Sequence, residues 1–140
     1  MIVGNKVTKA EINRHKDERV SGLNINISLS DVKLSEDLLE IKFRYKAEYE
    51  SGVADLVIEG FVYADEDKKR RDAIAKEWKD HKKLPDDFAE EVINSINYAC
   101  GAHGTLVARA VNLQPPMMPP MIKVDKSGTG GGSGGNQQAG

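Results

Sequence analysis

Alternation of apolar and charged residues is clearest in residues 38–50. Every second position holds an apolar side chain: Leu39, Ile41, Phe43, Tyr45, Ala47 and Tyr49. All the positions between them are charged. This period of two predicts a β-strand with one face on a core and the other in water, because a helix would spread the same apolar residues around its circumference. We therefore expect an antiparallel sheet with one wet face, whose dry face the other segments cover.

Two stretches that precede this strand in the sequence are also expected to join the sheet. Residues 23–30 repeat the alternation and predict a second half-buried strand. Residues 31–37 are polar apart from Val32 and Leu34, and a long hairpin connection is expected there. Residues 2–19 carry sparse apolar positions among charges, which predicts an irregular edge strand.

A strand is also predicted over residues 54–64, and both of its faces are apolar. Leu56, Ile58 and Val62 lie on one face, and Val57, Phe61 and Tyr63 lie on the other. Two apolar faces indicate either burial on both sides or a partner on the second face, and the sequence leaves both interpretations open. Gly60, which has no side chain, indicates a β-bulge or a close approach by another backbone at this position.

The period becomes helical after residue 64. Three acidic residues at 65–67 suit the start of a helix, where carboxylates meet the positive end of the dipole. Ile74 and Trp78 stand four residues apart and mark its apolar face. Pro85 is placed to begin a second helix, whose apolar face includes Phe88 and Val92.

A break in the second helix is expected at Gly101 and Gly104, followed by a third short helix that Thr105 could cap. The predicted fold class is therefore α+β. It consists of an antiparallel β-sheet of about four strands, with two main helices and one short helix on one face.

The C-terminal part changes composition twice. Residues 113–122 hold four prolines and three of the chain's four methionines, which forbids helix and sheet interior and predicts an extended arm. This arm is either a strap packed on the core or an adaptable apolar contact surface, because methionine repacks easily against varied partners. Residues 126–140 are rich in glycine and nearly free of apolar side chains, so we expect a disordered tail, native or an added linker. One domain, residues 1–125, precedes it.

The composition limits the classes of partner and the cellular compartment that we expect for this protein. Charged residues make up 30% of the chain but the net charge is only −2, so no strong field of one sign favours a nucleic-acid partner. Cys100 is the single cysteine, which rules out an intramolecular disulfide and favours a reducing compartment. Neither a signal peptide nor a run of ~20 apolar residues is apparent. The sequence predicts a cytoplasmic protein without membrane insertion.

Candidate chemistry is sparse. Cys100 and His103 form the only close pair of metal-type ligands, and His15 and His81 are scattered, so neither a zinc site nor any other cofactor is expected. Cys100 on an apolar helix face is interpreted as a buried core residue. The basic residues 68–71 are surrounded by acids and predict a solvated helix face. We therefore predict a non-enzymatic protein, with an enzyme using Cys100 and His103 as one alternative.

The order of elements, together with one short motif, resembles a known family. Long antiparallel strands come first, then a strand with two apolar faces, then helices. An Ala108-Arg109 pair and the stretch Asn112-Leu113-Gln114-Pro115 follow. Over residues 20–122 this is similar to the SecB family of export chaperones and SecB-like relatives. The charged helix over residues 65–83 is an insertion relative to the bacterial chaperones, and their acidic surface for the export motor is not recognisable here.

The resemblance implies an ATP-independent holdase that assembles into dimers or tetramers and captures unfolded or extended polypeptides in apolar grooves. SecB-like relatives also serve toxin–antitoxin systems, so a link to secretion does not follow. From the apolar residues open to a partner we predict a client-binding set: Val57, Phe61, Tyr63, Trp78, Met117, Met118, Met121 and Ile122. The alternatives are an accessory protein of a ribonucleoprotein or the ribosome, and a specific protein–protein adaptor.

Overall fold

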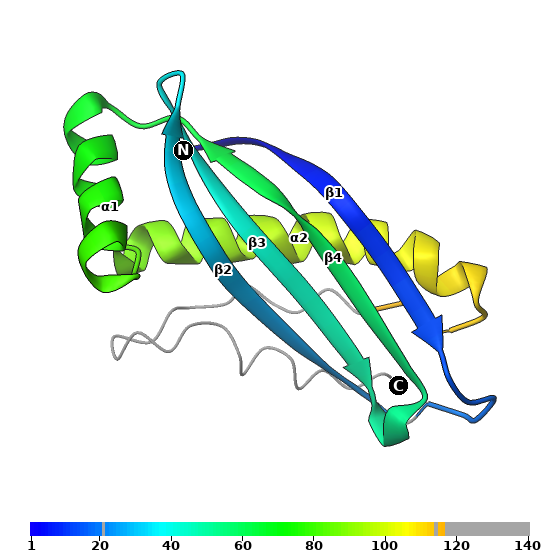
Figure 1. Ribbon diagram of the computed structural model, residues 1–140. Coiled ribbons are helices and arrows are strands. Elements are labelled where there is room, and N and C mark those ends of the chain that lie inside the picture. Colours follow the sequence, from blue (N-terminus) through cyan, green and yellow to red (C-terminus); the bar gives the residue numbers. More distant parts are fainter. Residues whose placement is uncertain (21, 114, 117–140) are drawn as a thin grey trace.

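The computed structural model describes residues 1–20, 22–113 and 115–116. Four strands come first: β1 (Ile2–Arg14), β2 (Leu23–Ser35), β3 (Leu38–Tyr49) and β4 (Ala54–Ala64). Two helices follow them, α1 (Lys68–His81) and α2 (Asp86–Ala110), and a short 3-10 turn, Glu50–Gly52, joins β3 to β4 (Figure 1). The predicted α+β class is confirmed.

The sheet is antiparallel throughout, in the order β1-β4-β3-β2. The two strands with the strongest sequence patterns, β3 and β4, therefore lie at its centre. All six alternating apolar residues of β3 are at most 2% exposed, which confirms the dry face. β1 is the predicted edge strand, and its irregularity takes the form of register shifts between Ile2 and Gly4 and between Val7 and Lys9.

β2 differs from the sequence prediction at its C-terminal end. β2 and β3 form the expected hairpin, but β2 continues to Ser35, so the expected long connection over residues 31–37 is wrong. A register shift between Leu29 and Asp31 inserts one extra residue and returns Val32 to the dry face. Such a bulge breaks the period of two and makes the continuing strand look like a loop. The actual connection is the two residues Glu36 and Asp37, both with positive φ, as tight hairpin turns require.

Both helices pack on the same face of the sheet. α2 contacts β1, β4 and β3, and α1 contacts β2 and β3 (Figure 1). Ile74 and Trp78 of α1 join the core, as predicted, together with Phe88 and Val92 of α2. Asp67 caps α1, because its carboxylate accepts a hydrogen bond from the Arg70 backbone N–H at 2.8 Å. Neither helix covers the other side of the sheet, which is therefore open among the described residues.

α2 is one continuous helix, so the predicted break and third short helix are wrong. Gly101 and Gly104 lie inside it and are buried. A Cβ at Gly104 would come within 2.9 Å of Pro116 Cγ and 3.2 Å of Leu56 Cδ2. This glycine is thus needed for close packing on the sheet and on the following chain, and it does not end the helix.

The chain reverses after α2. Asn112 has a φ of 57°, and the Leu113 N–H donates to the Ala108 carbonyl at 2.9 Å. Leu113 and Pro116 are buried. The rest of the predicted arm, including Met117, Met118, Met121 and Ile122, lies outside the described residues, as does the predicted tail over residues 126–140. Among the described residues, neither helix is long and apolar enough to cross a membrane.

Candidate functional site

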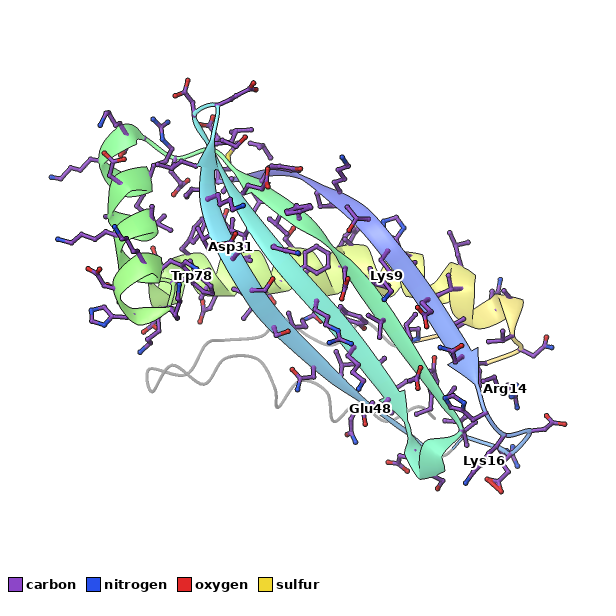
Figure 2. The ribbon with its side chains drawn as sticks, viewed as in Figure 1. Lys9, Arg14, Lys16, Asp31, Glu48 and Trp78 are labelled. Atoms are coloured by element: carbon purple, nitrogen blue, oxygen red, sulfur yellow. The ribbon has the colours of Figure 1, made fainter. Side chains whose placement is uncertain are left out.

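The face of the sheet away from the helices is the candidate functional surface, and we refer to it as the open face. Figure 2 views it directly, with Lys9 on β1, Asp31 on β2 and Glu48 on β3 labelled. Its charged and apolar side chains follow from the register: Lys6, Lys9, Glu11, Asp31, Lys33, Glu40, Lys42, Arg44, Lys46, Glu48, Asp55, Val57, Glu59, Phe61 and Tyr63. Neither helix packs on it, so it is exposed in the described part of the chain.

An apolar row on β4 interrupts this charged surface. Val57, Phe61 and Tyr63 are each half-buried on the open face. The rings of Phe61 and Tyr63 stack, with centroids 6.5 Å apart and planes inclined by 27°. The structure therefore brings three of the predicted client-binding residues together on one strand. Of the two interpretations of a strand with two apolar faces, burial on both sides is excluded for the described residues.

Trp78 does not join this row. It lies on α1, on the helix side of the sheet, and is only 8% exposed. Lys82 Nζ sits 5.8 Å from the centre of its ring and covers it further. Most of the side chain is therefore inaccessible to a client in this structure. Its role in client binding stays a prediction, and the arm residues of the same predicted set lie outside the described residues.

Most charges of the open face neutralise one another. Four pairs lie within this face: Lys9–Glu11, Lys33–Asp31, Arg44–Glu59 and Lys46–Glu48, at 3.6, 3.5, 3.5 and 3.1 Å. Exposed pairs of this kind contribute little to stability. Their effect here is to neutralise eight of the charges on the open face.

A shallow polar depression of about 430 Å³ lies where the open face meets the turn between β3 and β4. His15, Lys46, Glu48 and Asp55 are among its lining residues. His15 Nε2 lies 3.0 Å from Asp55 Oδ2, and this hydrogen bond lowers the pKa of the Asp55 carboxyl. The depression lacks the apolar walls of a typical small-molecule pocket.

The geometry gives little support to the alternative of an enzyme that uses Cys100 and His103. Cys100 is fully buried in the core, and burial raises the pKa of its thiol to about 12, the opposite of what a nucleophile needs. His103 is exposed on the same helix. The described residues contain no group of three or more metal-type side chains. Three of the four basic residues at 68–71 form ion pairs with acids: Lys68 with Asp72 at 2.9 Å, Arg70 with Asp87 at 2.9 Å and Arg71 with Asp37 at 3.6 Å.

One exposed apolar surface lies on α2 and was not predicted from the sequence. Tyr98 and Leu106 of α2 are 70% and 71% exposed. With Ala102 between them they follow a spacing of four residues, so all three lie on one side of the helix. Helical periodicity could have revealed this stripe, but the break assumed at Gly101 divided it between two helices.

Comparisons with known proteins identify the fold. No protein-family model matches the sequence, and no curated protein matches it either. Among solved structures, the chain is similar to the SecB-like chaperone Rv1957 of Mycobacterium tuberculosis, seen in complex with a ChAD peptide from the HigA1 antitoxin Rv1956. The TM-score is 0.58 at 7% identity, over 88% of this chain and 87% of that one. The chain therefore has a SecB-like fold.

Proposed function

We propose that this protein is a chaperone of the SecB-like type that binds unfolded or extended polypeptides without ATP. One observation carries the proposal: the row Val57, Phe61 and Tyr63 stands on a sheet face that neither helix covers. The fold supports it, since a protein of similar fold is a chaperone seen with a peptide bound.

The spacing of the row suits an extended client. The ring centroids of Phe61 and Tyr63 are 6.5 Å apart. Side chains two residues apart in an extended chain are separated by roughly 6.6 Å. A client lying along β4 can therefore place alternate apolar side chains on successive rings. Such contacts depend on apolar area and not on one sequence, as a holdase requires.

Two further surfaces belong to the proposal. The stripe with Tyr98 and Leu106 on α2 supports self-association into a dimer or tetramer, because apolar side chains of this size seldom stand so exposed without a partner. The arm residues Met117, Met118, Met121 and Ile122 are proposed as a second, adaptable contact with clients.

A specific adaptor is the second candidate. The apolar row is short and is enclosed by paired charges such as Arg44 and Glu59, a pattern that also suits a single partner of matching charge. A holdase should bind many unrelated unfolded chains with similar affinity, whereas an adaptor should bind one of them.

The test is a titration of the full chain against several unrelated, permanently unfolded polypeptides carrying a fluorescent label, with static light scattering to establish the oligomeric state. Micromolar or tighter binding to most of them at physiological salt is expected. Absence of binding to all of them by a folded protein would refute the proposal, and binding to one alone would favour the adaptor.

A further inference from the structure

We infer that the open face selects clients in which an acidic residue stands beside an apolar one. This inference rests on the proposed function and names the class of client. It follows from two lysines beside Phe61 that form no ion pair within the described residues.

The residues on either side of Phe61 are both lysines. In the register of the sheet, Phe61 lies between Lys6 of β1 and Lys42 of β3. Both lysines are exposed. Within the described residues neither forms an ion pair, in contrast to Lys9, Lys33 and Lys46 of the same face. The centre of the row is therefore an aromatic ring flanked by two free ammonium groups.

The geometry lets one client segment use all three side chains. Adjacent strands are about 4.8 Å apart, so the two lysines start one strand spacing from Phe61 on opposite sides. A client side chain packed on the ring places its neighbouring residues within reach of a lysine. An acidic residue there gains a charge contact close to an apolar surface, where water screens it less than in the open solvent. A basic residue at the same place meets like charge from both sides.

The neighbouring rows limit this preference to the Phe61 position. Tyr63 lies between Gly4, which has no side chain, and Glu40. Val57 lies between Glu11 and Lys46, each already paired within the face. The unpaired cations thus gather at Phe61, and an acidic residue of the client should occupy the position next to it.

An acidic polypeptide fits this surface better than a nucleic acid. Rings and lysines on a sheet could in principle hold a single strand of RNA. However, Glu40, Asp55 and Glu59 stand on the same face and would repel a continuous phosphate backbone. Two free lysines also release too few counterions for tight binding at physiological salt. A client with isolated carboxylates avoids both difficulties.

Three synthetic peptides of one length test the inference with the full chain. They share alternating phenylalanine and serine, and differ in having glutamate, glutamine or lysine at two positions next to phenylalanine. Each carries a fluorophore, and anisotropy reports binding at low and physiological salt. A labelled oligouridylate is the nucleic-acid probe. The variant K6E/K42E reverses the two lysines, and K69E/K83E is its control, because it changes the net charge equally at exposed positions away from the open face.

We expect the glutamate peptide to bind roughly threefold to tenfold tighter than the glutamine peptide, as two exposed charge contacts would give. The order should reverse in K6E/K42E and persist in K69E/K83E. Equal binding of the three peptides overturns the inference and leaves the proposed function standing. Failure of all three peptides refutes both, and tighter binding of oligouridylate at physiological salt replaces the inference with nucleic-acid recognition.

Discussion

Gly60 of β4 lies directly against the backbone carbonyl of Lys6 in β1. A Cβ at Gly60 would overlap that carbonyl oxygen and would come within 3.0 Å of Val7 Cα. The contact occurs beside the register shift between Val7 and Lys9. The bulged edge strand therefore approaches the central strand at the one position without a side chain, next to Phe61 of the open face.

Replacing Gly60 by alanine is expected to lower the free energy of unfolding by about 2 kcal/mol or more, because the backbone of β1 must move away to make room. Urea denaturation measures the change. Gly4→Ala is the control in the same pair of strands, because no atom lies within 4 Å of the Cβ position at Gly4. Equal stability of the two variants would show that β1 does not pack against Gly60 as described.

Alkaline pH is expected to destabilise the fold. Burial raises the pKa of Cys100 and of Tyr49 to about 12 each, and it raises the pKa of Tyr45 as well. In the unfolded chain these groups lose their protons at roughly pH 8.5 to 10, so above that range the unfolded state binds fewer protons than the folded state. The contribution of these three groups to the free energy of unfolding should be fully present below about pH 8 and should be lost as the pH rises toward 12.

Urea denaturation at successive pH values from 7 to 11 tests this dependence. Cys100→Ala should flatten the profile between pH 9 and 10, since it removes the group that ionises first in the unfolded chain. A profile for the unaltered protein that stays flat up to pH 11 would contradict the burial of all three groups.

Asn97 is expected to be a weak point of α2. It is 5% exposed, and within the described structure neither its Oδ1 nor its Nδ2 has a hydrogen-bond partner. Burying an unpaired amide is costly, so Asn97→Leu, which keeps the number and branching of the side-chain heavy atoms, should raise the free energy of unfolding by about 1 kcal/mol. Asn94→Leu is the control one turn earlier, because Asn94 does have a polar partner and should not gain stability. A loss of stability in Asn97→Leu would reveal a partner for that amide.

The sequence predicts the central elements well because their patterns are regular. The alternation of apolar and charged residues in β3 is unbroken, β4 is a continuous apolar stretch with few interruptions, and the acidic start of α1 matches its observed cap at Asp67. The end of β2 could not be predicted, because the bulge after Leu29 shifts the period by one residue. The break predicted at Gly101 and Gly104 is absent because both glycines are buried inside α2, and at Gly104 close packing against Leu56 and Pro116 outweighs the low helix propensity of glycine.

The candidate site was predictable only within a single strand. Val57, Phe61 and Tyr63 are placed together by the strand period itself. Whether Trp78 shares their surface depends on the side of the sheet to which α1 returns, and local periodicity carries no such information. The lysines beside Phe61 depend on the register between strands that are distant in sequence.

The most direct test of the proposed client-binding face compares two double variants of the full chain with an unfolded polypeptide that the unaltered protein binds. F61S/Y63S removes the stacked rings, and V3S/L34S removes two exposed apolar side chains, each 49% exposed, outside the apolar row. We predict that F61S/Y63S stays folded and binds the client at least about tenfold more weakly, since two aromatic contacts are lost, whereas V3S/L34S binds as the unaltered protein does. Equal affinity of the two variants, or a greater loss in V3S/L34S, would contradict the assignment of the open face as the client-binding surface.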